Sequence, residues 1–198
     1  MPNWDKLTEN LTKNGFIVHR FATAREAAAF LDGHIDGKTV GFGGSVTLRE
    51  LGLDKLLAAH NEVSDPWTQG SGANAGACAA QVYLTSVNGL AETGELINID
   101  GNGNRIASTI YGHQEVWFVV GANKIAPDFE KALWRARNIA SPKNAQRLAR
   151  KTPCAAKGDR CSDCDSPDRI CRVVSTHLRK PNGIPTAYVV LVEEELGY

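Results

Sequence analysis

The sequence has no excess of charge of either sign and no long apolar run. Its 198 residues include 22 Lys and Arg against 22 Asp and Glu, so no global field draws the chain to nucleic acid or to an anionic membrane. It has no stretch of about 18 apolar residues, the length that indicates a membrane-spanning helix. The first ten residues, MPNWDKLTEN, lack the basic and then apolar pattern of a secretory signal. We therefore expect a cytoplasmic protein whose partners are neither nucleic acid nor a membrane.

Several common site motifs are also missing. The five histidines are scattered, with no HxxxH or HExxH spacing that would place two of them on one helix face as metal ligands. The glycine-rich string GFGGSVT is neither the dinucleotide motif GxGxxG nor a P-loop, which would end in Gly-Lys-Ser or Gly-Lys-Thr. The chain has no internal repeat. Any site must therefore be built from residues that lie apart in the sequence.

Short apolar segments alternate with helical patterns along most of the chain. Residues 116–120, Val-Trp-Phe-Val-Val, are continuously apolar, which is typical of a strand buried on both faces in a parallel sheet. The alternation predicts an α/β fold with a mainly parallel sheet flanked by helices. Other strands are expected at 16–18, 38–42, 82–87, 96–99 and 187–192.

The length of the chain suits a single domain over residues 1–198. Residues 1–37 are expected as an N-terminal helical lead-in, and residues 151–172 as a cysteine-rich insert. Residues 61–77 contain proline and several glycines and predict a loop. Lys143, Arg147, Arg150 and Lys151 are interpreted as the solvated face of a helix.

A first candidate site lies in residues 41–47, where a predicted strand runs into a helix. Glycines let backbone N–H groups converge, and the start of a helix adds positive character, so this loop favours a phosphate or a carboxylate. The candidate ligand-binding residues are Gly43, Gly44, Ser45 and Thr47. The alternative is that Ser45 only caps the helix and the glycines only allow the turn.

A second candidate site comes from polar residues that follow three predicted strands. If these strands are neighbours in a parallel sheet, the polar side chains share one edge, where ligands bind in open α/β sheets. The residues concerned are Ser86, Asn88, Asp100, Asn104, Arg105, Asn123 and Lys124.

Two of these residues are the candidate catalytic pair. Arg105, with Lys124, would bind an anionic substrate. Asp100 would act as a general base or orient the substrate. The alternative is a structural ion pair between Asp100 and Arg105, with the asparagines as helix caps.

Four cysteines lie close together in the sequence. Cys154, Cys161, Cys164 and Cys171 have the spacing C-x6-C-x2-C-x6-C, and the central pair suits one metal centre. Both an iron–sulfur cluster and zinc accept four thiolates, and we favour the iron–sulfur cluster. The alternatives are redox-active thiols in a loop or disulfides formed on oxidation. The fifth cysteine, Cys78, is interpreted as a small core thiol.

Four long motifs resemble the LUD domain, the lactate-utilization family. They are GFGGSVTLRELGL, YLTSVNGLAETGELINIDGNGNR, VVGANKI and ALWRARNIASPKN. The later strings TPC, CSDC, RIC and ELGY resemble a subgroup of small single-domain members with a C-terminal four-cysteine motif. The resemblance implies a fold similar to the superfamily of ribose-5-phosphate isomerase, glucosamine-6-phosphate deaminase and CoA transferases. The Asp100-Gly101 pair is similar to the Asp-Gly pairs near catalytic carboxylates in that superfamily.

The resemblance also implies a role in the oxidation of lactate or a related organic acid. The ligand would be a small anionic metabolite, and the protein would be a redox subunit beside iron–sulfur or dehydrogenase partner subunits. The alternatives are an isomerase- or CoA-transferase-like enzyme with a structural metal, or a non-catalytic assembly or regulatory subunit. The chain has no obvious CoA-transferase glutamate motif. A homo-oligomer is compatible with all of these hypotheses.

Overall fold

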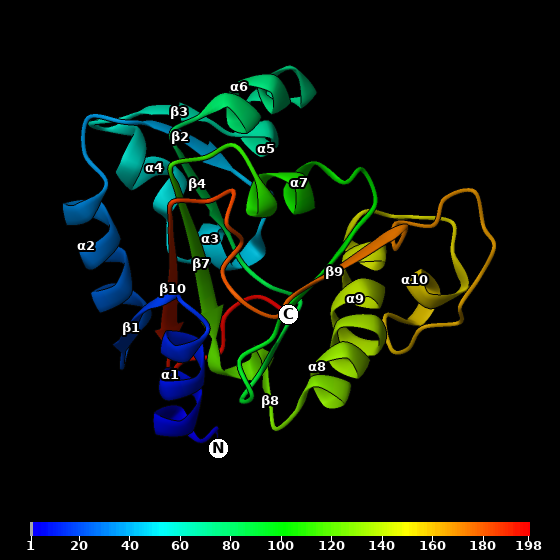
Figure 1. Cartoon of the computed structure of the whole chain (residues 1–198). Coiled ribbons are helices and arrows are strands. Elements are labelled where there is room, and N and C mark those ends of the chain that lie inside the picture. Colours follow the sequence, from blue (N-terminus) through cyan, green and yellow to red (C-terminus); the bar gives the residue numbers. More distant parts are fainter. Residues whose placement is uncertain (1) are drawn as a thin grey trace.

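A six-stranded parallel sheet forms the centre of the protein (Figure 1). The computed structural model describes residues 2–198, so Met1, the first residue of the expected lead-in, lies outside the described residues. The strands are, in spatial order, β1 (Ile17–Phe21), β10 (Thr186–Val192), β7 (Glu115–Gly121), β4 (Val82–Thr85), β2 (Thr39–Phe42) and β3 (Glu62–Ser64). The predicted α/β fold with a mainly parallel sheet is confirmed.

Both faces of this sheet are covered, which explains the continuous apolar sequence of β7. Successive side chains of a strand point to opposite faces. Trp117 and Val119 pack under one set of helices, whereas Phe118 and Val120 belong to the core on the other side. The first set comprises α2 (Ala24–His34), α3 (Val46–Glu50) and α4 (Leu53–Ala58), and the other face is covered in part by α1 (Trp4–Lys13) and α6 (Asn74–Ala79).

Local signals set several helix ends. Thr23 begins α2 through a capping box with Glu26, as the sequence pattern indicates. Gly52 separates α3 from α4 with a φ of 66°, in the left-handed region that glycine adopts without strain.

A smaller second sheet lies beside the main one. Its strands are, in spatial order, β8 (Ile125–Ala126), β5 (Gly89–Ala91), β6 (Leu96–Asp100) and β9 (Val173–His177). The strand expected at 96–99 therefore lies in the second sheet and is not a neighbour of β4 and β7 in the parallel sheet, the arrangement on which the second candidate site was conditional. Only residues 86–95 separate β4 from β6, whereas a crossover to a parallel neighbour needs about a dozen residues or more. The chain instead folds back, and β5 and β6 pair antiparallel.

Two other regions differ from the expectation. Residues 61–77, predicted as a loop, contain β3, α5 (Pro66–Gln69), η1 (Ser71–Ala73) and the first half of α6. The short strand predicted at 16–18 forms as β1 between α1 and α2, and β1 pairs with β10 at the edge of the main sheet, so residues 1–37 are not only a helical lead-in. The first 37 residues are thus an integral part of the sheet and its covering layers.

The remaining helices follow β6 in the chain, and α8, α9 and α10 lie to the right of the main sheet in Figure 1. They are α7 (Asn104–Ile110), α8 (Phe129–Arg135), the π-helical turn η3 (Ala136–Ala140), α9 (Ser141–Arg147) and α10 (Pro153–Lys157), with the short η2 (Ala122–Lys124) after β7. Residues of β5, β6, α8 and η3 share a third apolar core. None of the helices within residues 2–198 has the length and apolar character needed to cross a membrane.

Candidate functional site

A cavity of about 330 Å³ lies where the carboxyl ends of β4, β6 and β7 meet the loop after β2. It is lined by eight of the eleven residues predicted as catalytic or ligand-binding, which are Gly44, Ser45, Ser86, Asn88, Asp100, Asn104, Arg105 and Lys124. These residues converge although β6 belongs to the second sheet, because β6 ends against the same edge that β4 and β7 form. The structure thus brings the two candidate sites of the sequence together in one cavity.

The other three predicted residues lie behind the cavity wall. The Thr47 hydroxyl donates to the carbonyl of Leu196 at 3.2 Å. The Asn123 side chain accepts from the Leu196 N–H and donates to the carbonyl of Gly197, so it holds the C-terminal residues in place. Gly43 is buried. These residues support the cavity rather than line it.

Arg105 lies on the first turn of α7 and is held in a fixed orientation. Its Nη1 donates to Asn98 Oδ1 at 2.9 Å, and its Nη2 donates to Asn88 Oδ1 at 3.0 Å and to the carbonyl of Ile99 at 2.6 Å. Of the five N–H donors of a guanidinium, Nε–H and one on Nη1 have no protein partner within residues 2–198. Burial lowers the pKa of Arg105, although Asp100 acts in the opposite direction. The side chain stays cationic and keeps donors for a ligand.

Asp100 mainly holds the turn that follows β6. Its Oδ1 accepts from the Gly101 N–H at 2.7 Å, and its Oδ2 accepts from the backbone N–H groups of Arg105 at 3.1 Å and Ile106 at 3.3 Å. These bonds satisfy N–H groups at the start of α7 that have no partner inside the helix. The side chains of Asp100 and Arg105 do not form a direct ion pair. Asp100 has a structural role nevertheless, because its carboxylate accepts from backbone N–H groups.

Lys124 lies at the end of η2 and lines the cavity with a side chain that is almost fully buried, since the residue is 3% exposed. Its Nζ donates to Thr47 Oγ1 at 2.7 Å and to Ser86 Oγ at 2.9 Å. Burial, together with the nearby cations Arg135 and Arg105, lowers the pKa of Lys124 to about 7, against the weaker influence of Glu50. A substantial fraction of this amine is therefore neutral near neutral pH.

The glycines of residues 41–47 are needed for close packing. A Cβ on Gly43 would lie 2.5 Å from the hydroxyl oxygen of Tyr83, and one on Gly44 would lie 2.0 Å from Trp67 Nε1. Ser45 Oγ accepts from the Leu48 N–H at 3.4 Å and so acts as the N-cap of α3. Because α3 is only five residues long, its N-terminus alone does not make an anion site.

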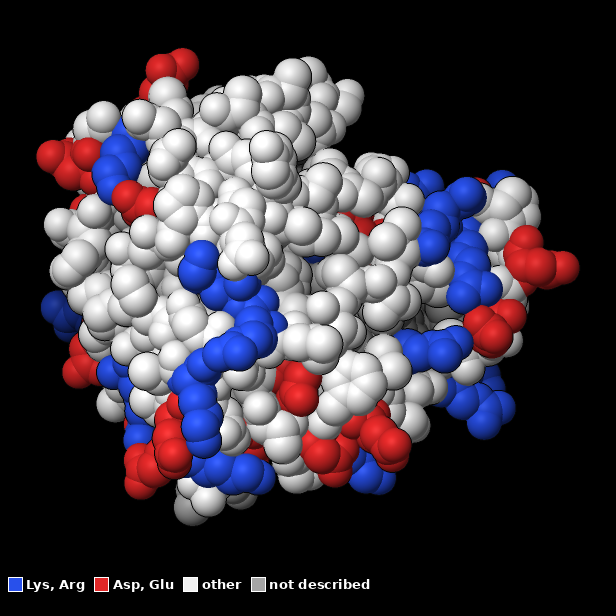
Figure 2. Space-filling view, in the orientation of Figure 1, with Lys and Arg blue, Asp and Glu red and all other residues white. Residues whose placement is uncertain are grey.

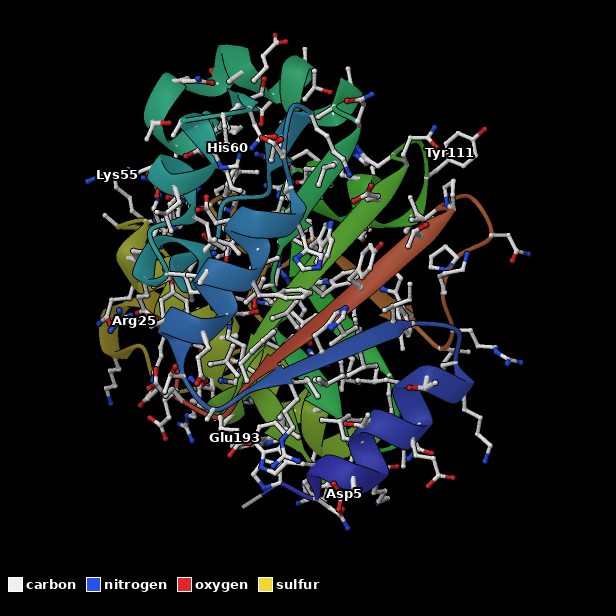
Figure 3. The ribbon with its side chains drawn as sticks, turned by 90° about the vertical axis from the view of Figure 1, so that its left-hand side faces the viewer. Asp5, Arg25, Lys55, His60, Tyr111 and Glu193 are labelled. Carbon is white, nitrogen blue, oxygen red and sulfur yellow. The ribbon has the colours of Figure 1, made fainter. Side chains whose placement is uncertain are left out.

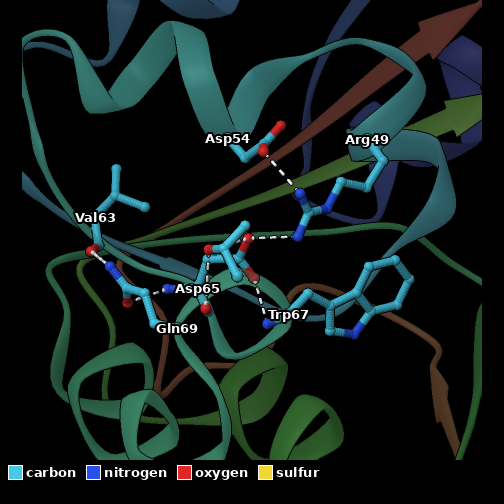
Figure 4. A network of polar contacts seen from close by, with 7 residues as sticks. Arg49, Asp54, Val63, Asp65, Trp67 and Gln69 are labelled. Carbon is cyan, nitrogen blue, oxygen red and sulfur yellow. Dashed lines mark hydrogen bonds and ion pairs between the residues drawn. The ribbon is translucent and has the colours of Figure 1, made fainter.

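The sequence analysis missed Trp67, which lies on α5 over Gly44. A buried carboxylate, Asp65, begins α5: its Oδ1 accepts from the Trp67 N–H at 2.9 Å, and its Oδ2 accepts from Arg49 Nη2 at 2.9 Å (Figure 4). Arg49 also pairs with Asp54 at 2.8 Å. This network holds Trp67 at the cavity wall.

Arg147, interpreted from the sequence as part of a solvated helix face, also belongs to this wall. Its guanidinium lies 4.4 Å from the centre of the Trp67 ring, and its Nε donates to the Tyr198 hydroxyl at 2.8 Å. Trp67, Arg147 and Tyr198 all line the cavity. The spacing of charges on a helix could not reveal that this helix packs against α5 and the C-terminus.

The cavity is locally cationic in a protein without net charge. On the face shown in Figure 2, acidic and basic side chains occur together. The cavity lining, in contrast, has Asp100 as its single acidic side chain and four basic residues, namely Arg105, Lys124, Arg147 and Arg150, of which Lys124 has a lowered pKa. Such a lining favours a ligand with negative charge.

The four C-terminal cysteines are all free and partly buried. Within residues 2–198, no group of three or more His, Cys, Asp or Glu side chains is placed so that it could hold a metal ion. Arg169 organises part of this segment instead, since its guanidinium donates to the carbonyls of Cys164 and Cys171 and to Asp163. The metal stays a prediction from the spacing of the cysteines.

Cys78 differs from its interpretation as a core thiol. It lies exposed on α6, and its sulfur accepts from the Ser108 hydroxyl at 3.7 Å.

The doubly covered parallel sheet places the protein in the α/β class, and the cationic cavity lies at the carboxyl edge of the sheet, where ligands of such folds bind. Residues 4–192 match the LUD domain family, and the chain belongs to that family, which relates it to lactate utilization. The chain is also similar to the crystal structure of a DUF162 family protein from Deinococcus radiodurans, with a TM-score of 0.53, 12% identity, and coverage of 96% of this chain and 95% of that one. This similarity shows the fold. A comparison with curated proteins found no match.

Proposed function

We propose that the cavity binds a small organic acid of the lactate type and that Arg105 receives its carboxylate. The observation that carries the proposal is the Arg105 guanidinium, which three acceptors hold in place while two of its donors stay without a protein partner. A guanidinium oriented in this way suits a carboxylate. Membership of the LUD domain family supports an acid related to lactate as the ligand.

The environment of Arg105 supports the same assignment. No ion pair within the described residues neutralises this guanidinium, and the nearest carboxylate, that of Asp100, accepts bonds from backbone N–H groups. The hydroxyl and amide groups of Ser86, Asn88 and Asn104 can orient the rest of the ligand. The cavity volume is at the lower end of the range for ligand sites, about 300–1,000 Å³, which suits a small metabolite.

We expect Arg105→Gln to weaken the binding of lactate and pyruvate at least about tenfold, which corresponds to about 1.4 kcal/mol. The measurement is isothermal titration calorimetry with each acid and with lactamide, which lacks the charge. Arg25→Gln is the matched control, because Arg25 lies exposed on α2 (Figure 3). Equal affinities of the wild type and Arg105→Gln, or binding of lactamide as tight as that of lactate, would contradict the proposal.

The redox part of the function depends on the cysteine spacing and on partner subunits. If the four cysteines hold an iron–sulfur cluster, protein purified under anaerobic conditions will contain iron and sulfide and absorb visible light, and Cys161→Ser will lose both metal and colour. Zinc would give a colourless protein with about one metal per chain. A metal-free protein that binds lactate normally would refute both cofactors.

A further inference from the structure

Lys124 is unusual because it is buried, faces a cavity and has no carboxylate partner. Its two hydrogen-bonding partners, Thr47 Oγ1 and Ser86 Oγ, are neutral hydroxyls. Among the described residues it forms no ion pair, and the charged groups that act on it are the cations Arg135 and Arg105 and, more weakly and in the opposite direction, the carboxylate of Glu50. Lysines are almost never fully buried without a partner, because burial disfavours the charged amine.

The two hydroxyls orient the amine. The Thr47 hydroxyl hydrogen is directed to the carbonyl of Leu196, so Thr47 Oγ1 can only accept from Lys124. Ser86 Oγ has no other partner within the described residues and can either accept a hydrogen from the amine or return one to it. A neutral amine held in this way retains its lone pair for a group in the cavity.

The cavity offers a reason for such an amine. Ser86 and Lys124 lie in the same lining as Arg105, the residue that receives a carboxylate under the proposed function. A neutral, desolvated lysine is a nucleophile toward carbonyl carbon. Burial without a carboxylate partner and a position at the cavity surface are both features that suit a lysine nucleophile.

We propose that Lys124 is a nucleophile that forms an imine with the carbonyl of a small 2-oxo acid, the oxidised counterpart of a 2-hydroxy acid. This inference rests on the proposed function, because Arg105 would hold the carboxylate next to the reacting carbonyl. The Nζ lone pair adds to the carbonyl carbon and forms a C–N bond, and a proton passes from nitrogen to oxygen. The C–O bond then breaks as the second proton of the nitrogen moves to the leaving hydroxyl, which departs as water and leaves the neutral imine. No oxidant or reductant is needed, and Ser86 is placed to relay the proton.

The test is reductive trapping with pyruvate and sodium cyanoborohydride, followed by intact mass and peptide mapping. We expect one secondary-amine adduct on the peptide that contains Lys124, absent in Lys124→Arg and retained in Lys55→Arg, where the exposed Lys55 is the matched control (Figure 3). The rate of imine formation, measured at a cyanoborohydride concentration at which reduction is not limiting, should rise with pH around a midpoint near the lowered pKa of Lys124, about 7. Mapping of the wild type gives the answer even if Lys124→Arg fails to fold.

Binding and trapping separate the two proposals. Pyruvate that binds by calorimetry but leaves no adduct at Lys124 would overturn the imine and leave the anion site standing. Adducts spread over exposed lysines, or an unchanged adduct in Lys124→Arg, would overturn it as well. Failure of both lactate and pyruvate to bind would instead refute the proposed function, since lactate has no carbonyl that could form an imine.

Discussion

The stability of the wild-type protein should rise with pH between about 7 and 10.5 relative to that of Lys124→Met. The pKa of Lys124 is about 7 in the folded protein, against 10.5 for an ordinary lysine. Between these values the unfolded chain binds a proton that the folded chain does not bind, so the free energy of unfolding increases with pH. The difference between the two pKa values, about 3.5 units, corresponds to about 5 kcal/mol over the whole range.

Below pH 7 the amine is protonated in both states, and the folded state bears the full cost of burying the charge. Lys124→Met is therefore expected to be more stable than the wild type at pH 6, and to lose this advantage as pH rises toward 10. Urea unfolding of both proteins at intervals of half a pH unit measures the difference, in which the titration of groups that do not interact with Lys124 cancels. Lys55→Met should follow the wild type at every pH. Parallel curves for the wild type and Lys124→Met would show that Lys124 titrates normally.

Groups that lower the stability of the fold are found at functional sites, where activity requires them. An apolar residue at position 124 is expected to make the protein more stable near neutral pH. The protein instead has a buried amine at the cavity wall, which two hydroxyls orient. The nucleophile inferred above would require the same three atoms, namely Lys124 Nζ, Thr47 Oγ1 and Ser86 Oγ. The pH dependence of stability thus tests the physical premise of that inference without any ligand.

Much of the fold could be predicted, because its strongest signals are local. The continuous apolar run in β7, the capping box of α2 and the glycine between α3 and α4 each act within a few residues. The strand at 96–99 was also recognised, but not its partner. The short connection to β4 and the pairing with β9, more than 70 residues later in the chain, determine to which of the two sheets this strand belongs. The apolar pattern of a strand does not contain that information.

The candidate site shows the same contrast between local signals, which the sequence contains, and tertiary contacts, which it does not reveal. The polar residues at the strand ends could be predicted as site residues, because ligands of α/β sheets bind at the carboxyl ends of the strands and the sequence shows where the strands end. Trp67 and Arg147 were missed as site residues, because they reach the cavity through a short helix and through the packing of α9 against it. The role of Asp100 was also hidden, since its partners are backbone N–H groups that are set by the turn itself. The type of a residue and its place in the sequence indicate a candidate site residue, whereas its hydrogen-bonding partners depend on tertiary contacts.

The network that positions Trp67 leads to the second large expected effect. Asp65→Asn is expected to lower the free energy of unfolding by about 3 kcal/mol, the cost of breaking a buried ion pair from one side. Asp65 is 2% exposed and accepts from Arg49 Nη2, from the Trp67 N–H and from the Thr68 hydroxyl. The amide would place N–H donors against Arg49, although its oxygen could still cap α5. Asp65→Ala removes the cap as well and should cost about 1 kcal/mol more.

Asp54→Asn is the matched control, because Asp54 pairs with the same guanidinium from the other side (Figure 4). Its carboxylate accepts one bond from Arg49 Nη1, so its loss should cost about 1 kcal/mol. Urea unfolding gives the three free energies, and calorimetry with lactate shows whether the wall around Gly44 stays in place. Equal costs for Asp54→Asn and Asp65→Asn would contradict the central role of Asp65. A larger cost for Asp65→Asn together with weaker lactate binding would show that this network, which contacts the cavity only through Trp67, determines the shape of the site.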